Sequence, residues 1–251
     1  MNAKTGPDKQ ANDGVFTDLD WRLILEARPL SVSEQIAEHI SQAILLGEYQ
    51  PGQRIPEQSI ADQYQVSRGP VREALRLLEH EAVIEILPRR GAQVTSLSVE
   101  EVVDIFNIRA SLIGLCVRLV VENLQPDQFS QIEELVNRLS EISTKPESTN
   151  EYLSISFRLS LYMGRNSGNE RLYELVRSLS RQTVRYTSLG LSTPERRQRS
   201  AEVWQIMLKA IKKRDGEAAE CACRTLVEES RTAAIGHLST APDKLEDAAL
   251  S

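Results

Sequence analysis

Three arginines recur at intervals of four residues in the segment Ser67–Leu78, which reads SRGPVREALRLL. On a helix, Arg68, Arg72 and Arg76 would line one flank, because a step of four residues turns only about 40° beyond a full turn. A neighbouring face would be apolar and would anchor the helix in a core; it carries Val71, Ala74, Leu75 and Leu78. The forked guanidinium group can bond to O6 and N7 of guanine or clamp a phosphate. The pattern therefore predicts a helix that enters the major groove of DNA.

The residues around this helix fit contacts with the DNA backbone. Ser67 and the free N–H groups at the helix start can take a phosphate. Arg89 and Arg90, followed by Gly91, are predicted to form a hairpin tip that reaches the neighbouring backbone or the minor groove. The alternative is that the arginines form ion pairs on a solvated surface with the nearby glutamates, which are Glu73, Glu79, Glu81 and Glu85.

The charge balance argues against a protein that coats nucleic acid without selectivity. The 251 residues include 30 Lys and Arg against 36 Asp and Glu, a formal net charge of −6. Residues 31–98 alone hold six arginines, no lysine and nine acids. Non-specific affinity should therefore be weak, and tight binding should need two copies of the domain. This favours a dimer on a two-fold symmetric operator.

The elements that must position the arginines follow from local signals. A capping box of Ser31 and Glu34 starts a helix that stops near Gly47. A short helix is expected over 57–64, and a third from Ser67 to about 82, with Pro70 tolerated in its first turn. Strands are expected over 83–87 and 92–95, joined by a hairpin loop at 88–91. Three helices and a hairpin form a winged helix-turn-helix domain, assigned to residues 30–97 after a flexible N-terminal arm of residues 1–29.

The rest of the chain is predicted to be helical, so the fold class is mainly α. From Ser98 no stretch alternates with period two, and an all-α bundle of six or seven helices is expected over 98–240, followed by a tail of residues 241–251. The first helix of this bundle has an apolar stripe of Val102, Ile105, Ile108, Leu112, Cys116 and Leu119, and a later one has Leu172, Leu175, Val176 and Leu179. Helix starts are expected at Ser98, Pro126, Asn150, Thr193 and Asp215, and Ser167-Gly168-Asn169 is expected to break one helix from the next.

Several protein classes are disfavoured. The three thiols, Cys116, Cys221 and Cys223, are too few for a disulfide framework. The N-terminus lacks the apolar core of a signal peptide, and no apolar run is long enough for a membrane span, so a cytoplasmic protein is expected. A Gly-rich phosphate loop, a Gly-x-Ser-x-Gly elbow and an activated cysteine motif are missing from the sequence, which argues against an enzyme.

The run PGQRIPEQSIADQYQVSRGPVREALRLLEHEAVIEILPRRGAQV resembles the winged-helix domain of GntR-family bacterial transcription regulators. The helical remainder is similar to the ligand-binding domain of their FadR subfamily, in the FCD group. The resemblance implies homodimers that bind short palindromes and respond to a small effector, often an organic acid. It also implies that Ser67 contacts a phosphate, that Arg68 and Arg72 contact bases or phosphates, and that Gly91 lets the wing approach DNA. Some relatives place an arginine near Gln58, where a glutamine would read adenine rather than guanine.

Many relatives hold a divalent metal inside the bundle with one Asp or Asn and three His. The corresponding positions here are Ser156, Ser160, Trp204 and Leu226. None of these residues is a ligand for a transition metal, so the resemblance predicts that the metal site is lost and that no cofactor is bound. The register leaves open whether Arg158 or Ser160 faces the pocket.

An effector pocket without metal is still expected within the bundle. Its candidate residues are Arg109, Ser156, Ser160, Arg185 and Trp204. A buried arginine requires a carboxylate or several acceptors, so an organic acid with an apolar body would fit. The alternatives are that the arginines pair with Asp104 or Glu174 or lie on the outside, and that Trp204 only fills the core. The main functional hypothesis is a ligand-responsive transcriptional regulator, against a DNA-binding module without effector or an enzyme with an appended DNA-binding domain.

Overall fold

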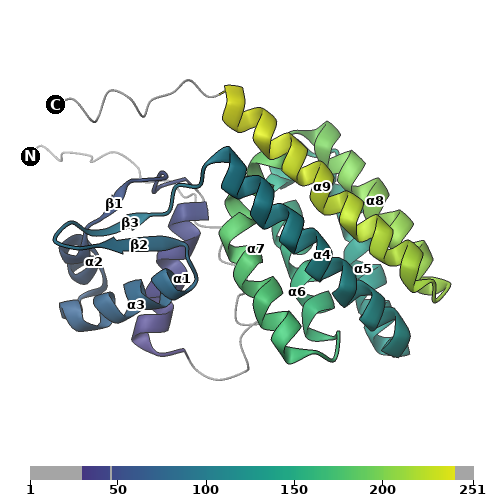
Figure 1. The fold of residues 1–251 in the computed structure, drawn as a ribbon, viewed down its shortest axis with the longest axis horizontal. Helices are drawn as coiled ribbons and strands as arrows, with labels where there is room; N and C mark the ends of the chain where they lie inside the picture. Colours follow the sequence, from purple (N-terminus) through teal and green to yellow (C-terminus); the bar gives the residue numbers. More distant parts are fainter. Residues whose placement is uncertain (1–29, 46, 241–251) are drawn as a thin grey trace, which may run out of the picture.

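The computed structural model describes residues 30–45 and 47–240, which form two units side by side (Figure 1). The predicted arm of residues 1–29 and the predicted tail of residues 241–251 lie outside the described residues. The predicted domain boundary near Leu97 falls in the link between the last strand of the first unit and the first helix of the second.

The N-terminal unit is a winged helix-turn-helix domain, as predicted. Its elements are α1 (Val32–Leu45), β1 (Arg54–Ile55), α2 (Glu57–Tyr64), α3 (Arg68–His80), β2 (Ile84–Leu87) and β3 (Gly91–Val94). The strands form an antiparallel sheet in the order β1-β3-β2. Strand β1 was not expected from the sequence, because two residues are too few to show an alternating pattern. It pairs Ile55 with Ala92 and closes the free edge of the hairpin.

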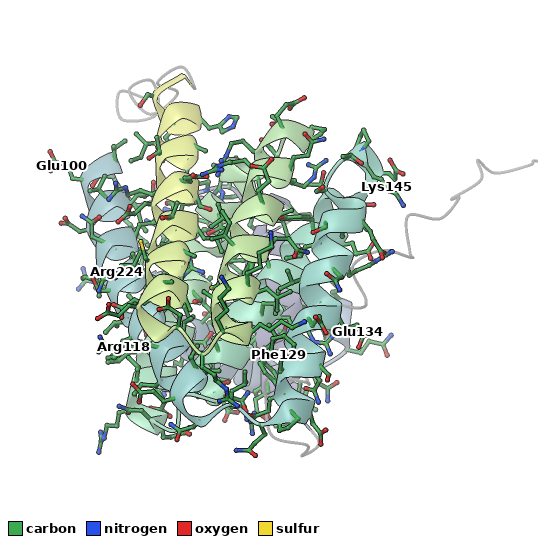
Figure 2. All side chains as sticks on the ribbon, turned by 90° about the vertical axis from the view of Figure 1, so that its right-hand side faces the viewer. Glu100, Arg118, Phe129, Glu134, Lys145 and Arg224 are labelled. Atoms are coloured by element: carbon green, nitrogen blue, oxygen red, sulfur yellow. The ribbon has the colours of Figure 1, made fainter. Side chains whose placement is uncertain are left out.

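The second unit is the predicted bundle, and six α-helices lie in its described part. They are α4 (Val99–Asn123), α5 (Pro126–Ile142), α6 (Thr149–Arg165), α7 (Glu170–Gly190), α8 (Pro194–Lys212) and α9 (Gly216–Thr240). Helix α4 packs most extensively against α9. Helix α7 is the helix of the bundle that faces the N-terminal unit (Figure 1). Charged side chains such as Glu100, Arg118 and Arg224 lie on the outside of the bundle (Figure 2). No helix among the described residues could span a bilayer.

Most of the predicted helix starts are confirmed. The side chains of Asn169, Thr193 and Asp215 accept hydrogen bonds from the first turns of α7, α8 and α9, and capping boxes form at Ser31 and Ser98. The prediction for Asn150 was wrong, because a short 3₁₀ helix, Pro146–Ser148, leads into α6 two residues earlier. Prolines accept the first position of such a turn, since their missing N–H would be unpaired there.

The predicted apolar stripes were partly wrong. Ile108 and Leu175 are 53% and 55% exposed. Val102 and Cys116 of the predicted stripe are buried, and the buried face of α4 also carries Phe106, Arg109, Ala110, Ile113, Val117 and Val120. Two rows of residues on α4 both satisfy the helical period, and only packing against α9 and α7 decides which row is buried. The face that turns inward is the one that carries an arginine.

Candidate functional site: a DNA-binding surface and a bundle cavity

Helix α3 has the two faces that a recognition helix requires. Val71, Ala74, Leu75 and Leu78 are at most 1% exposed and pack in the core of the N-terminal unit. Arg68, Arg72 and Arg76 are all exposed on the other side. The N-terminal end of α3 and the loop of the β2–β3 hairpin point away from the bundle (Figure 1). The guanidinium groups are therefore accessible to a large partner.

The three arginines are not paired with the glutamates that the sequence suggested. Arg68 Nε donates to Gln58 Oε1 at 2.6 Å, and Arg72 Nε lies 3.0 Å from Glu57 Oε2. Gln58 in turn donates to Asp62 at 2.7 Å. These partners all belong to α2, so α2 orients Arg68 and Arg72. The contact of Glu57 was missed, because the sequence predicted that the two helices are neighbours but not which of their side chains meet.

The glutamates that the sequence suggested as partners form contacts elsewhere in the structure. Glu73 accepts from the Ser33 hydroxyl of α1, and Glu79 accepts from the backbone N–H of Ile86. Glu85 accepts from Gln93 across the sheet. Glu81 forms an ion pair with the bundle, described below.

The hairpin tip has the backbone that its sequence requires. Arg90 N donates to Leu87 O at 3.1 Å, which closes the turn, and Arg89 and Arg90 are exposed. Gly91 has φ +82°, a left-handed conformation that strains any residue with a Cβ. Ser67 occupies the N-cap position of α3, yet its hydroxyl forms no capping hydrogen bond. The first N–H groups of α3 are therefore not capped by that side chain.

The bundle encloses one cavity that joins four of the five predicted effector residues. Arg109, Ser156, Ser160 and Trp204 all line it. Four further hydroxyl groups that the sequence analysis missed lie around the same space, namely Ser180, Thr187, Ser200 and Ser230. Each sits on a helix whose other buried positions are mostly apolar. A hydroxyl residue within such an apolar stripe was the only signal in the sequence that could have indicated these positions. The wall is otherwise apolar, with Leu153, Phe157 and Val227 among its members.

Arg109 is the charged group of this cavity. It is 6% exposed, and its Nε donates to Ser180 Oγ at 3.2 Å. Burial lowers the pKa of Arg109 to about 10, so the group stays a cation at neutral pH. No carboxylate in the described part of the chain forms an ion pair with it. A buried cation without a counterion is costly, and an anion in the cavity would offset that cost.

Other polar atoms at the cavity also lack partners among the described residues. They are Ser156 Oγ, Thr187 Oγ1 and Trp204 Nε1. Buried polar groups without hydrogen bonds are rare in native proteins, and a ligand is one way to satisfy them. The cavity thus combines one cation, several hydroxyls and one indole N–H with an apolar wall.

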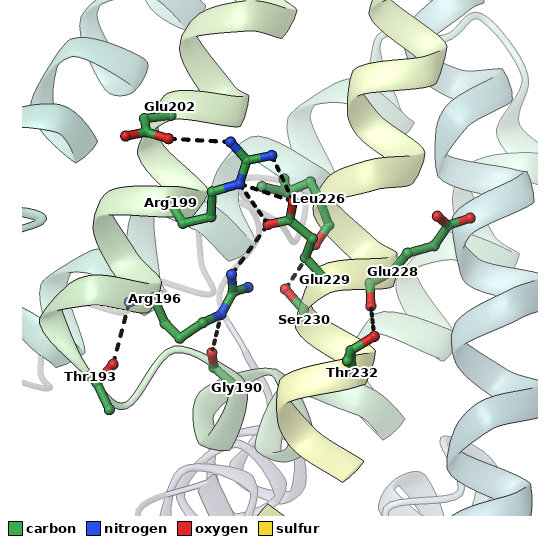
Figure 3. Close-up of polar contacts among 10 residues, drawn as sticks. All are labelled: Gly190, Thr193, Arg196, Arg199, Glu202, Leu226, Glu228, Glu229, Ser230 and Thr232. Atoms are coloured by element: carbon green, nitrogen blue, oxygen red, sulfur yellow. Dashed lines mark hydrogen bonds and ion pairs between the residues drawn. The ribbon is translucent and has the colours of Figure 1, made fainter. Parts of the chain in front are cut away.

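A partly exposed ion-pair network bridges α8 and α9 near the cavity. Glu229 of α9 accepts from Arg199 Nη2 at 2.8 Å and from Arg196 Nη1 at 3.2 Å (Figure 3). Arg199 also lies 3.3 Å from Glu202. Helix α8 also carries Ser200 and Trp204, and α9 carries Ser230, so the network links two helices that line the cavity.

Arg185 and Arg158 do not line the cavity. Arg185 Nη2 donates to Gln50 Oε1 of the N-terminal unit at 3.2 Å, and its side chain lines a pocket between the two units. Arg158 is exposed in a groove beside α5. The question left open by the sequence is therefore decided for Ser160, which is buried and lines the cavity.

The four positions that the family resemblance matched to metal ligands come together around this cavity. Ser156, Ser160, Trp204 and Leu226 all belong to its wall. Hydroxyl, indole and alkyl groups do not form a site for a transition metal. The described residues contain no group of three or more His, Cys, Asp or Glu that could hold one. The residues of this cavity therefore do not fit a transition metal.

An exposed arginine helix on a winged helix-turn-helix domain, joined to a helical bundle with a polar cavity, defines a DNA-binding transcriptional regulator with a ligand-binding domain. Residues 32–94 match the model of the bacterial regulatory proteins of the gntR family, and residues 104–229 match the FCD domain. The chain belongs to the GntR family of regulators and carries an FCD effector-binding domain.

Known proteins agree with this assignment. The chain is 26% identical over 193 residues to the HTH-type transcriptional regulator McbR of Escherichia coli, covering 75% of this chain and 86% of McbR. It is 34% identical over 106 residues to the uncharacterized regulator YdhC of Bacillus subtilis, a match that spans 42% of this chain and about half of YdhC, 47%. The solved structure of E. coli McbR/YncC superposes with a TM-score of 0.72 at 22% identity, covering 84% of this chain and all of that one. A putative GntR regulator of Rhodococcus sp. RHA1 gives a TM-score of 0.68 at 20% identity, covering 82% and 99%.

Proposed function

We propose that this protein is a cytoplasmic regulator that binds a palindromic operator as a homodimer and is controlled by an organic acid in the Arg109 cavity. The observation that carries the effector part is the buried guanidinium of Arg109, which has no carboxylate partner in the described chain. A ligand carboxylate would supply the missing charge, and the apolar wall would take an apolar body.

The DNA-binding part of the proposal assigns a role to each residue of the exposed surface. Arg68, Arg72 and Arg76 read bases or clamp phosphates in the major groove. Gln58 reads an adenine, while Ser67 and the wing residues, which are Arg89, Arg90 and Gly91, position the backbone. The relatives' names support this reading, since McbR is a named transcriptional regulator.

The dimer follows from the charge of the N-terminal unit. Its six arginines are outnumbered by nine acids, so one copy would have little non-specific attraction for DNA. Two copies on a two-fold symmetric site add their specific contacts. Light scattering of the purified protein would give the mass of two chains if the proposal is right.

The effector is proposed to bind without a metal and to be a monocarboxylate. One buried cation neutralises one carboxylate, and the hydroxyl groups around it serve as neutral donors or acceptors. Ser156, Ser160 and Trp204 would contact the ligand, because atoms of Ser156 and Trp204 have no other partner among the described residues. Arg185 lies outside the cavity and would act on the domain interface rather than on the acid.

A thermal-shift screen tests the effector. Butyrate, hexanoate, benzoate and phenylacetate would be added to the wild-type protein, and a specific ligand must raise its Tm. The shift should vanish in Arg109→Gln and persist in Arg158→Gln, a matched arginine that lies outside the cavity. An equal shift in Arg109→Gln would show that the acid binds elsewhere.

A further inference from the structure

Two consecutive residues of α7 connect the bundle cavity with the recognition helix. Ser180 accepts the hydrogen bond of the buried Arg109 at 3.2 Å. Arg181, the next residue, turns toward the N-terminal unit, where its Nη1 lies 2.5 Å from Glu81 Oε2. The side chains of this ion pair are only 9% and 21% exposed, so water screens it poorly.

The position of Glu81 makes this ion pair significant. Glu81 is the C-cap residue of α3, the helix whose other end carries Arg68 and Arg72. A helix of 13 residues is a stiff rod about 20 Å long, so a movement of its capped end changes the direction of the whole element. Arg181 therefore fixes one end of the recognition helix to the wall of the cavity.

The same helix makes further contacts with the N-terminal unit and the link. Tyr186 Oη accepts a hydrogen bond from the backbone N–H of Leu97, between β3 and α4, at 3.3 Å. Arg185 donates to Gln50. Val184 lines both the bundle cavity and the pocket between the units. Helix α7 is thus the common wall of the two spaces.

The cavity is too tight to accept an acid without moving its walls. The space that the centre of a water-sized molecule can reach in it is about 40 Å³. One water needs roughly 10–15 Å³ of such space, so a ligand of more than a few heavy atoms must displace the lining helices. Helix α7 contributes Ser180, Val184 and Thr187 to the lining. A carboxylate at Arg109 also competes with Ser180 for the guanidinium group.

We propose that α7 transmits effector binding to the recognition helix, with Arg181 as the positioning residue that pulls on the capped end of α3 through Glu81. This inference rests on the proposed role of the Arg109 cavity as the effector site. In the ligand-free protein the ion pair holds α3 in one orientation. When the cavity is filled, Ser180 moves with α7, Arg181 follows, and the angle of α3 changes relative to its DNA site.

The transmission can be tested without knowing the effector, because a bulky side chain can stand in for it. Ser180→Leu places an extra apolar group in the cavity and pushes on α7. We expect this variant to change operator affinity at least about fivefold, the lower end of ordinary allosteric coupling. The same substitution in an Arg181→Gln background should change affinity less than twofold. Arg171→Gln, an exposed arginine on the same helix, is the matched control and should leave the response to Ser180→Leu intact.

A charge exchange separates transmission from a general loss of structure. Arg181→Glu combined with Glu81→Arg should restore the response to Ser180→Leu, whereas each single exchange should abolish it. Circular dichroism and Tm would identify a variant that fails to fold, in which case Arg109→Leu replaces Ser180→Leu as the disturbance of the cavity. An equal change in operator affinity with and without the Arg181–Glu81 pair, in folded variants, would overturn the proposal.

The outcome of the acid screen is independent of the comparison of Ser180→Leu with and without the Arg181–Glu81 ion pair. A protein that responds to no acid but shows the coupling would contradict the proposed effector class and support the transmission. A protein that responds to an acid equally with and without Arg181 would support the effector and overturn the role of α7.

Discussion

At the residue scale, the contact of Arg72 with Glu57 sets the chemistry of the DNA-binding surface. The side chains are 63% and 29% exposed, so the pair adds little to stability. Its role is to hold the guanidinium fork in one direction and to keep a negative charge beside it. Such an arrangement favours a site with correctly placed acceptors over a bare phosphate backbone.

Two substitutions test this surface. Arg72→Ala should weaken operator binding by about 1–3 kcal/mol while leaving Tm within a degree or two, since the side chain is exposed. Glu57→Gln should instead increase binding to unrelated DNA and reduce the preference for the operator. Both effects are read from titrations of labelled operator and of scrambled duplex at one salt concentration, with Arg158→Ala as the control. Unchanged operator affinity in Arg72→Ala would remove that residue from the interface.

Glu38 provides a second prediction at this scale, on the pH dependence of stability. Burial between α1 and the bundle raises the pKa of this carboxyl to about 8, although nearby Arg181 acts in the opposite direction. Between about pH 4.5 and 8 the folded protein holds a proton that the unfolded chain releases, so stability falls as the pH rises through this window.

The amide in Glu38→Gln cannot ionise. We expect the variant to lose this part of the pH dependence and to be more stable than the wild type at pH 8 by about 2 kcal/mol. Denaturant titrations at pH 5 and pH 8 measure it, and Glu48→Gln, on the exposed surface of the same unit, should behave as the wild type does. Parallel pH profiles for the wild type and Glu38→Gln would refute the buried, protonated carboxyl.

At the element scale, the packing of the bundle depends on a few close contacts. Arg197 of α8 is fully buried and donates to Thr149 Oγ1 and to the carbonyl groups of Lys145, Leu191 and Ser192. These bonds tie α8 to the segments that precede α6 and follow α7. Arg197→Met leaves the acceptors buried and unpaired. We therefore expect the free energy of unfolding, measured by chemical denaturation, to fall by about 3 kcal/mol. Arg199→Met, which removes only exposed ion pairs, should cost less than about 1 kcal/mol.

Helices α7 and α9 are in close contact at Gly190. A Cβ at this position would lie 2.7 Å from the backbone oxygen of Ser230, which cannot move aside without α9. Gly190→Ala should therefore lower stability by about 2 kcal/mol, measured by urea denaturation. Gly236→Ala on α9, where a Cβ meets nothing within 4 Å, should be neutral or stabilising. Equal effects of the two substitutions would contradict the close contact.

The helices and strands also show which structural features could be predicted from the sequence. Capping residues and hydrophobic periods predicted the winged domain and the bundle, because these signals are local. Ile108 and Leu175 were misassigned because several rows of a helix satisfy the same period, and the neighbouring helices choose among them. Arg109, Ser156, Ser160 and Trp204, which the sequence analysis grouped, line one cavity, whereas Arg185 lines the pocket between the two units. The hydroxyls of Ser180, Ser200 and Ser230 come from three different helices, so only the folded chain brings them together.

At the scale of the whole molecule, the two units have separate apolar cores. Polar contacts between them include Arg181 with Glu81, Arg185 with Gln50, and Tyr186 with the link residue Leu97. Because no single apolar core spans both units, we expect that one unit can rotate relative to the other. In the proposed homodimer, such a rotation would change the spacing of the two DNA-binding domains.

The composition of the cavity gives a prediction about metals for the molecule as a whole. Dialysis against EDTA should leave Tm and operator binding unchanged, and elemental analysis should find no stoichiometric zinc, nickel or manganese. The reason is that Ser156, Ser160, Trp204 and Leu226, which line the cavity at the positions that the family resemblance matched to metal ligands, offer no imidazole or carboxylate. One metal per chain, or a fall in Tm on chelation, would refute this expectation.

The ring of hydroxyl groups in the bundle has an evolutionary consequence. A serine differs from alanine by one oxygen and from threonine by one methyl group. Its hydroxyl group can rotate and can either donate or accept a hydrogen bond. Single-nucleotide changes can thus alter which ligand the cavity binds best, while the N-terminal unit keeps its DNA sites. If the cavity is the effector site, as proposed, a lineage with this architecture can change its effector by single substitutions without changing its operator.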